Sequence, residues 1–359
     1  MRAPNDFIGM LGFPSSPAGV DGGRSAQEEN GKMKRQRSLL QMAAAGVAMG
    51  AMLAGGLASA PIVHADDANG DLFYTTFSGG GDRVFKRPYT FTGGVLSFGA
   101  EVGISGVPDG LGGADGLLFD PTNPNFLIVG GQNDHFYRVD VASGAAVASP
   151  STGAASIFHL AADPDGTSVW GSGIPDDPIA KVNLAGGAGF VGAPSLLTIT
   201  SGGDGVESLT GLAFVGSTAY YTSSGAGGTG SFGTVNLVTG DTTQLFGGVD
   251  AAHGILFDPF TGDLILVGDS EIRQYDPVGG VFVAELDVAG NQFDQAAADG
   301  KGHLFVASND SDLFFIDYSG TSDLDAVGNF STLVSGFKAD LDDVAPLSGP
   351  GSQEQPIPE

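Results

Sequence analysis

The sequence contains no cysteine among its 359 residues. Disulfide bonds and thiolate metal sites are therefore excluded as sources of stability or chemistry. Basic residues are also scarce, because 14 Lys and Arg stand against 41 Asp and Glu, a formal net charge of −27. Such a surface repels nucleic acid and anionic membranes, so we expect neither as a partner.

Helical patterns are missing as well. None of the apolar runs shows a stripe at the 3.6-residue period of a helix that is long enough to form one. The chain instead has 60 glycines and 19 prolines, spread between short runs rich in Val, Ile, Leu, Phe and Tyr. Short β-type runs separated by turn residues indicate a large all-β protein rather than a disordered chain.

Residues 1–65 are predicted to be a leader that contains a signal peptide. Four basic residues precede a small and apolar stretch, Ser38 to Leu57, and small residues are then placed for cleavage after Ala65 or Ala60. The stretch is rich in Ala and Gly and only weakly apolar, so we expect a cleaved signal rather than a membrane anchor. Residues 1–65 hold six of the 14 basic and four of the 41 acidic residues, which leaves a mature net charge of −29. We therefore expect an exported protein, extracellular or periplasmic, with no membrane span in the mature chain.

Two markers repeat along the chain in step with each other. The first is a turn after an apolar run, and its copies begin at Asp120, Asp163, Val215, Asp258 and Asp299. The second is Asp or Asn before a Gly-rich turn, at Asp140, Asn183, Asn236, Asp276 and Asp317, with a weaker copy at Thr90. Both markers recur every 40–53 residues, and each unit holds about four short β-type runs. A repeat of this length with four strands is typical of a β-propeller blade.

The two ends of the chain predict how the blades close into a ring. Residues 71–104 supply three strands without an innermost one, and residues 339–347 supply an innermost strand with nothing after it. The other five blades begin near Asp115, Phe158, Thr210, His253 and Asp294. A blade shared by both ends removes the open sheet edges. The prediction is an all-β, six-bladed β-propeller closed by pairing of N- and C-terminal strands, as a single domain over residues 66–347. Residues 348–359 are then a disordered Pro-rich tail, and residues 191–208 a long loop.

Through these blades and the FDPxxG-type turns, residues 70–347 resemble the six-bladed propellers of exported bacterial proteins. That group includes the gluconolactonase-like calcium-dependent hydrolases and virginiamycin B lyase. The resemblance implies the architecture, and no position of this chain matches the family's calcium-binding Glu, Asn and Asp set or its channel-facing His and Glu. The tail at Pro356 to Glu359 is similar to the start of a PEP-CTERM sorting tail, which would imply a truncated sequence.

Innermost strands line the axis of a propeller, so equivalent positions near their starts are candidates for a site. Counting five residues back from each turn Asp selects the candidate binding residues Asp115, Thr210, His253, Asp294 and Asp342, with Glu207 as a further member. The same offset selects Phe158 in the third unit. Since strand residues alternate between faces, His159 is predicted to point away from the axis unless a β-bulge intervenes.

The candidate ring suggests a divalent cation. Carboxylates gathered in a narrow space repel one another unless a cation or protons neutralise them. The candidate ligands are Asp115, His253, Asp294 and Asp342. Oxygen ligands suit calcium, and the addition of His253 would admit zinc or manganese. The alternative is that a repeated Asp only caps turns. His135 and His303 are expected at the surface.

Two functions remain open from the sequence. The first is an exported ligand-binding or scaffold protein, acting as a monomer, that holds a small molecule, a polysaccharide or a protein at the channel face. The second is a metal-dependent hydrolase or lyase with its site at the mouth of the channel. No catalytic residue is assigned, because no nucleophile elbow, EF-hand or phosphate-binding loop is complete.

Overall fold

A computed structural model describes residues 68–347 of the chain, with gaps at 78–82, 105–113, 132, 155, 174–177, 185–186, 188, 202–205, 207, 224–229, 290 and 339–340. All described residues belong to the compact unit Val63–Glu359. The predicted leader, the predicted tail and Glu207 lie outside the described residues. Within those residues, no helix has the length and apolar character needed to cross a membrane.

The described strands form six antiparallel sheets, and each sheet is one blade. The first blade contains β25 (Leu341–Leu347), β1 (Ala68–Thr76), β2 (Val84–Thr92) and β3 (Val95–Phe98), with β4 (Val102–Ile104) also paired to β2. The second contains β5 (Ala114–Phe119), β6 (Phe126–Gly131), β7 (Tyr137–Asp140) and β8 (Ala146–Ala148). The third contains β9 (Leu160–Ala162), β10 (Ser168–Gly171), β11 (Ile179–Leu184) and β12 (Phe190–Leu197).

The remaining three blades follow the same order along the chain. The fourth contains β13 (Gly211–Val215), β14 (Thr218–Ser223), β15 (Gly230–Val235) and β16 (Thr242–Val249). The fifth contains β17 (Gly254–Asp258), β18 (Asp263–Gly268), β19 (Glu271–Asp276) and β20 (Val281–Asp287). The sixth contains β21 (Phe293–Ala298), β22 (His303–Ser308), β23 (Asp312–Asp317) and β24 (Phe330–Val334).

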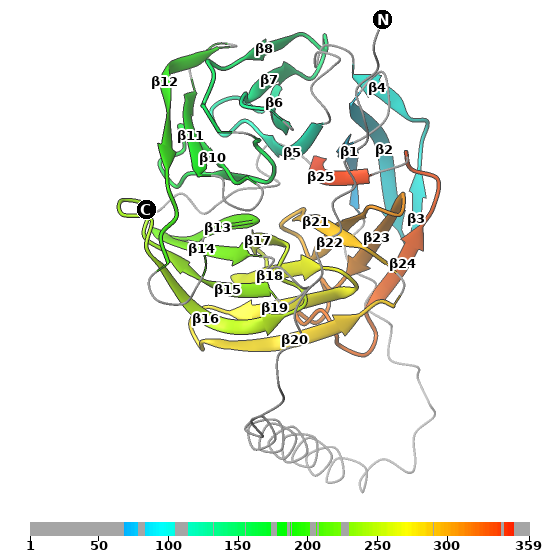
Figure 1. Cartoon of the computed structure of the whole chain (residues 1–359). Coiled ribbons are helices and arrows are strands. Elements are labelled where there is room, and N and C mark those ends of the chain that lie inside the picture. Colours follow the sequence, from blue (N-terminus) through cyan, green and yellow to red (C-terminus); the bar gives the residue numbers. More distant parts are fainter. Residues whose placement is uncertain are drawn as a thin grey trace, which may run out of the picture. The chain divides into compact units, whose positions relative to one another are not determined.

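The six innermost strands form a closed ring around the axis. Each contacts the next in the order β25, β5, β9, β13, β17, β21 and back to β25. Figure 1 shows the outer strands of each blade lying progressively farther from this centre. The predicted six-bladed β-propeller is therefore confirmed, and the described chain is all-β.

The ring closes within the first blade. Strand β25 pairs antiparallel with β1, from Asp71 opposite Leu347 to Thr76 opposite Leu341. Leu341 of β25 packs in the same core cluster as Tyr74 of β1. The last strand therefore supplies both hydrogen bonds and apolar contacts to the first, as the sequence predicts.

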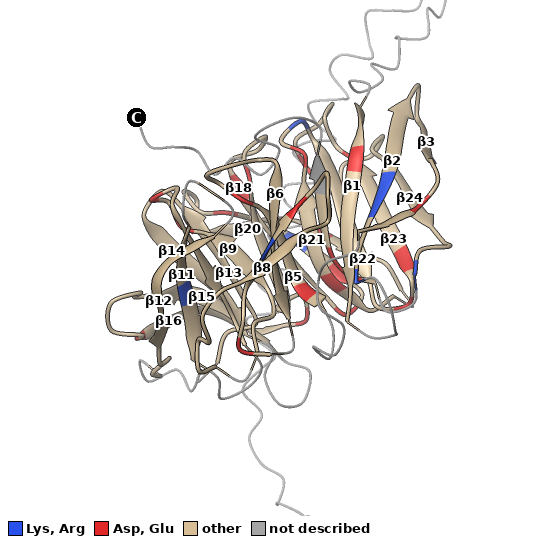
Figure 2. Cartoon of the chain, turned by 90° about the horizontal axis from the view of Figure 1, so that it is seen from above, with Lys and Arg blue, Asp and Glu red and all other residues tan. Residues whose placement is uncertain are grey.

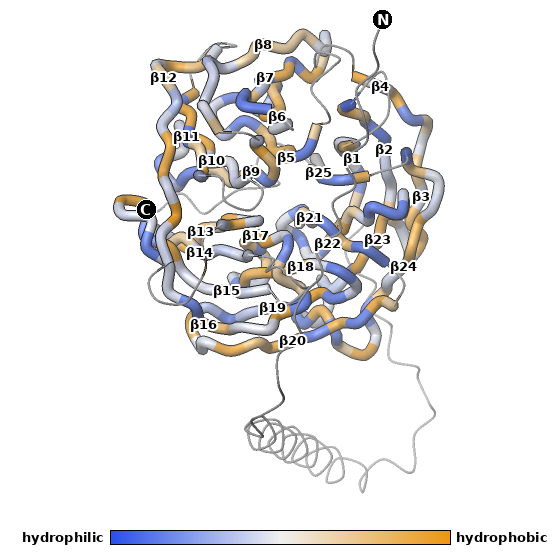
Figure 3. Tube along the Cα trace, in the orientation of Figure 1, coloured by the Kyte–Doolittle hydropathy of each residue, from blue (hydrophilic) through white to orange (hydrophobic). Residues whose placement is uncertain are grey.

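Apolar side chains on the faces of neighbouring blades form the core. Between the sixth blade and the first, the ring centroids of Tyr89 and Phe305 are 5.0 Å apart, and those of Phe91 and Phe315 are 5.1 Å apart. Burial of one such side chain stabilises the fold by roughly 1.5–3 kcal/mol. Figure 3 shows hydrophobic and hydrophilic residues alternating along many of the strands. Strand β22 is buried at every position, because its two faces pack in the core clusters toward the first and the fifth blades.

Two predictions about individual segments are wrong. Residues 191–208 are not all loop, because β12 supplies the fourth strand of the third blade. Pro194 lies within β12, at the edge of the sheet, where a missing N–H is tolerated. His303 is not at the surface but fully buried, with its Nδ1 2.7 Å from the Asp299 carboxylate and its ring stacked on Phe315. Neither correction changes the number of blades.

Few cations accompany the many carboxylates of the propeller. Figure 2 shows Lys and Arg sparsely placed among Asp and Glu. One of them, Arg138 of β7, is fully buried and forms an ion pair with the fully buried Asp120. Arg138 also donates to the carbonyl of Gly189 in the third blade at 3.0 Å. This pair therefore helps to join the second and third blades.

Candidate functional site

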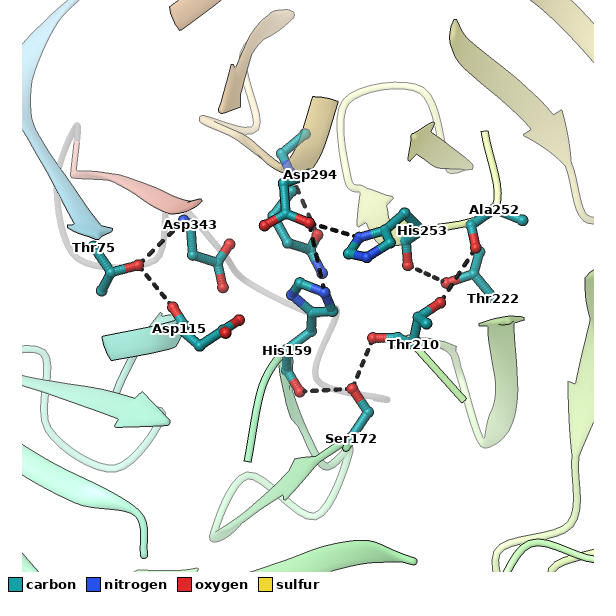
Figure 4. A network of polar contacts seen from close by, with 12 residues as sticks. Thr75, Asp115, His159, Ser172, Thr210, Thr222, Ala252, His253, Asp294 and Asp343 are labelled. Atoms are coloured by element: carbon teal, nitrogen blue, oxygen red, sulfur yellow. Dashed lines mark hydrogen bonds and ion pairs between the residues drawn. The ribbon is translucent and has the colours of Figure 1, made fainter. Parts of the chain in front are cut away.

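The innermost strands carry a repeated irregularity near the axis. In β5, β21 and β25 the pairing register shifts, so that the inner strand has one extra residue relative to its partner strand. The residue pairs at these shifts are Asp115-Gly116, Asp294-Gln295 and Asp342-Asp343. A β-bulge of this kind re-aims the side chains at the insertion. The bulges thus help to gather polar side chains around the axis (Figure 4).

The third blade has an equivalent bulge just before β9. The carbonyl of Ser172 accepts a hydrogen bond from the N–H of Phe158 at 2.7 Å, and the N–H of Ser172 donates to the carbonyl of His159 at 3.0 Å. Phe158 and His159 therefore both lie opposite the single residue Ser172. Regular alternation predicts that His159 points away from the axis unless a β-bulge intervenes, and this bulge is present. Figure 4 accordingly shows the His159 ring beside Asp294 and His253. His159, rather than Phe158, contributes the polar side chain of this blade.

His159 and His253 both approach the carboxylate of Asp294. Nδ1 of His253 lies 2.7 Å from Oδ1 of Asp294, and Nε2 of His159 lies 3.9 Å from the same oxygen. The two imidazole rings meet edge to face with centroids 4.9 Å apart. His159 and Asp294 are buried, whereas the His253 side chain is 37% exposed. His253 is therefore the member of this group that solvent reaches most easily.

Three more carboxyl groups complete what we call the axial cluster, which consists of Asp115, His159, His253, Asp294, Asp342 and Asp343. The carboxyl group of Asp342 is hydrogen-bonded to those of Asp115 and Asp294. The carboxyl group of Asp343 accepts the N–H of Leu117 at 2.8 Å. Burial first, then the negative charges of Asp115 and Asp294, raises the pKa of both Asp342 and Asp343 well above the usual value. Four carboxyl groups thus crowd around two imidazoles.

The two histidines differ in protonation. Burial lowers the pKa of His159 from 6.5 to about 4, against the opposing effect of Asp294. Burial also acts to lower the pKa of His253, but the adjacent Asp294 carboxylate outweighs it and raises the value to about 9. Burial acts to raise the pKa of Asp294, yet the His253 imidazolium holds it below the usual range. At neutral pH a neutral His159 therefore lies beside a His253–Asp294 ion pair.

The structure brings together most of the residues that the sequence offset selects. Asp115, His253, Asp294 and Asp342 lie in the axial cluster. Thr210 uses its hydroxyl for the backbone instead, donating to the carbonyl of Ala252 at 3.2 Å. Glu207 lies outside the described residues. His159 and Asp343 are the two members that the offset missed.

Hydroxyl groups on, or directly after, the second strands of three blades hydrogen-bond to the backbone near the axis. Each donates to a main-chain carbonyl at the start of the next blade, at 2.7 Å. The bonds run from Thr75 to Asp115, from Ser172 to Thr210 and from Thr222 to His253. Thr75 also accepts the N–H of Asp343 at 3.1 Å. The three bonds to Asp115, Thr210 and His253 cross from blade to blade, so they set the spacing between axial side chains.

The repeated aspartates of the two sequence markers have a different role. The carboxylate of Asp120 accepts hydrogen bonds from the N–H groups of the residues two and three positions ahead, and that of Asp258 does the same. Asp140 and Asp276 cap their turns in the same way. Turn capping therefore explains the markers, whereas the axial carboxylates contact one another and the histidines.

Nδ1 of His159 and Oδ2 of Asp342 are buried polar atoms of the axial cluster without a hydrogen-bond partner within the described protein. Nδ1 of His253, in contrast, forms the ion pair with Asp294. A buried polar atom without a partner costs about 1–3 kcal/mol, so folded proteins retain few of them. The unpartnered atoms of His159 and Asp342 belong to side chains that are at least nine-tenths buried. The axial cluster thus has donor and acceptor capacity that the protein itself does not use.

The depressed pKa of His159 predicts a pH-dependent stability. Between pH 4 and 6.5 the unfolded chain binds a proton at this imidazole and the folded chain does not, so the free energy of unfolding rises with pH. Relative to His159→Gln, which cannot titrate, wild-type protein should gain about 3 kcal/mol across this window. Urea unfolding of both proteins in EDTA, from pH 4 to 7, measures the difference. A difference that does not vary with pH would show that His159 titrates normally.

Comparison with known proteins supports the fold. No family model and no curated protein matches the sequence. A chain in the crystal structure of a nidogen/laminin complex is similar, with a TM-score of 0.57 and 14% identity over 77% of this chain and 97% of that one. A chain in the crystal structure of a mitotic checkpoint complex gives 0.42 and 15%, over 71% and 77%. At 14% identity the first similarity shows the propeller fold alone. The resemblance to gluconolactonase-like enzymes and virginiamycin B lyase, and that of the tail, stay predictions.

Proposed function

We propose that the protein is an exported ligand-binding β-propeller whose axial cluster holds a divalent cation. The observation that carries the proposal is the convergence of His159, His253 and Asp294. One donor atom from each of these three side chains lies within 4.8 Å of the other two. They come from the third, fifth and sixth blades, so only the closed ring brings them together.

The surroundings of these three side chains favour a bound cation. Asp115, Asp342 and Asp343 add three buried carboxyl groups, and the described ion pairs of Asp294 use histidine as the cation. A divalent ion would relieve the repulsion among these groups. The unpartnered Oδ2 of Asp342 and Nδ1 of His159 are further atoms that a cation or its bound ligand can use.

Export and partners follow from the sequence and the charge. The predicted signal peptide supports an extracellular or periplasmic location. The net charge of −27 disfavours nucleic acid and anionic membranes as partners. A small molecule, a polysaccharide or a protein remains the expected ligand, reaching the site from the side on which His253 is exposed.

Metal analysis of the purified protein tests the proposal. We expect close to one divalent ion per chain after gel filtration, and a higher melting temperature with the ion than in EDTA. The double variant Asp294→Asn and Asp342→Asn replaces two carboxyl groups by amides at nearly constant volume, and should lose the ion and the EDTA effect. The readouts are elemental analysis by mass spectrometry and thermal unfolding.

Asp276→Asn is the matched control, since Asp276 only caps an exposed turn. It should keep the ion. A protein that takes up no divalent ion when supplied in excess, and melts identically with and without EDTA, would instead be a metal-free scaffold. In that case the axial polar groups would be purely structural.

A metal-dependent hydrolase or lyase is the second candidate, and the number of donors favours it. Three protein ligands leave a coordination position for water, which is the arrangement of catalytic zinc sites. A bound cation at this point would polarise a carbonyl or activate a water. His253, being partly exposed, is the donor nearest to an incoming substrate.

A further inference from the structure

We infer that the axial site selects a late first-row transition ion of the zinc class over calcium. The inference rests on the proposed function and adds the class of ion. The sequence offset alone finds one imidazole among carboxylates, a set that calcium could share. The bulge at Phe158 and His159 changes the donor set, because it places a second imidazole beside the same carboxylate.

Donor chemistry separates the two ions. Calcium takes six to eight oxygen ligands and has little affinity for imidazole nitrogen. Imidazole nitrogen suits zinc, copper, nickel and iron. His159 and His253 supply two nitrogens and Asp294 one oxygen, so the donor set at the point of closest approach is nitrogen-rich.

The distances between donor atoms also fit a small tetrahedral ion. Bonds of 2.0–2.1 Å in a tetrahedron place neighbouring ligand atoms about 3.3 Å apart. The two measured separations from Oδ1 of Asp294 are 2.7 Å to His253 and 3.9 Å to His159, one on each side of this value. Small side-chain movements therefore suffice, with release of the proton that His253 shares with Asp294.

The backbone of the donor residues is already held in place. The carbonyl of His253 accepts the hydroxyl of Thr222 at 2.7 Å, and the carbonyl of His159 accepts the N–H of Ser172 at 3.0 Å. Asp294 is buried. Pre-positioned ligands reduce the ordering cost of binding an ion, and their supporting hydrogen bonds tune affinity.

A second acidic group provides a contrast. Glu271, Glu285 and Asp287 also have donor atoms within 4.8 Å of one another. All are oxygens, and the Glu271 carboxylate already binds Arg273 at 2.6 Å. Two of its three members are exposed, and the group serves as the control for ion binding outside the axis.

Isothermal titration of the full chain, stripped with EDTA and then dialysed, tests the ion class. The probes are zinc chloride, calcium chloride and magnesium chloride at pH 7.5. We expect one zinc ion per chain, bound roughly 100-fold or more tightly than calcium or magnesium. Cobalt(II) provides a spectroscopic readout, because four-coordinate cobalt absorbs visible light much more strongly than six-coordinate cobalt.

Single-ligand variants assign the site. His159→Gln and His253→Gln should each weaken zinc binding by at least roughly tenfold and abolish the four-coordinate cobalt bands. His135→Gln and Glu285→Gln should change neither, since both residues lie outside the axial cluster. Near-ultraviolet circular dichroism shows whether each variant is folded. If His159→Gln does not fold, the partly exposed His253 carries the assignment alone.

The outcomes separate this inference from the proposed function. Calcium binding as tight as zinc binding, or zinc binding unaffected by His253→Gln, overturns the zinc assignment. If the double variant Asp294→Asn and Asp342→Asn still loses its bound divalent ion, the proposed function stands. If no divalent ion binds to the axial cluster, both fail.

Discussion

Deletion of residues 341–359 should abolish cooperative unfolding of the propeller. The deletion removes β25, which pairs with β1 and contacts both β5 and β21, so it opens the ring between the sixth and second blades. It also removes Leu341 and Val344 from the core shared with Tyr74, and leaves the inner edge of β1 unpaired. Thermal denaturation followed by circular dichroism should show no sharp transition, with binding of a hydrophobic dye at room temperature.

A shorter deletion and a peptide separate loss of this strand from loss of the chain end. Removal of residues 348–359, which the sequence predicts to be a tail, should leave the melting temperature unchanged. A synthetic peptide of residues 338–347 added to the longer deletion should restore a transition by adding the missing strand, and a scrambled peptide should not. A sharp transition in the longer deletion without peptide would show that five complete blades and an incomplete first blade suffice.

The fold could be predicted because its signals are local and repeated. Turn caps such as Asp140 and Asp276 recur at the same point of each blade, so their spacing reports the length of the repeating unit. The strand β12 was less visible, because Gly192 and Pro194 interrupt the expected run of strand formers. His303 could not be placed from its own segment. The aromatic ring of Phe91, from the first blade, helps to bury it, and that contact exists only after the propeller closes.

The axial cluster could be predicted only in part from the sequence, for a related reason. A fixed offset from the turn Asp assumes regular alternation along each inner strand, and it locates Asp115, Asp294 and Asp342. The bulges break that alternation at the axis, which is why His159 and Asp343 were missed. A polar residue directly after a selected position, as at both of these sites, is the signal that could have revealed them.

Close approach of neighbouring innermost strands explains why glycine follows the axial residue in the second and fifth blades. Gly116 follows Asp115, and Gly254 follows His253. A Cβ on Gly254 would lie 2.6 Å from the carbonyl oxygen of Asp294 in the next blade. At these points the innermost strands approach too closely for a side chain. The same close approach brings the axial residues of neighbouring blades together. The contact between blades and the axial cluster therefore both require closely spaced innermost strands.

Gly116→Ala should therefore be the most damaging single substitution of a small residue near the axis. The new Cβ would lie 1.8 Å from the carbonyl oxygen of Phe158, and this backbone atom can move only if the second and third blades separate. We expect a loss of about 3 kcal/mol or more in the free energy of unfolding, or roughly 6–10 °C in melting temperature.

Gly320→Ala is the control, because nothing lies within 4 Å of its Cβ and its φ is not positive. Since Phe158 precedes His159, the folded fraction of Gly116→Ala should also bind zinc more weakly than Gly320→Ala. Equal melting temperatures for the two variants would mean that the blades do not meet as closely as the structure shows.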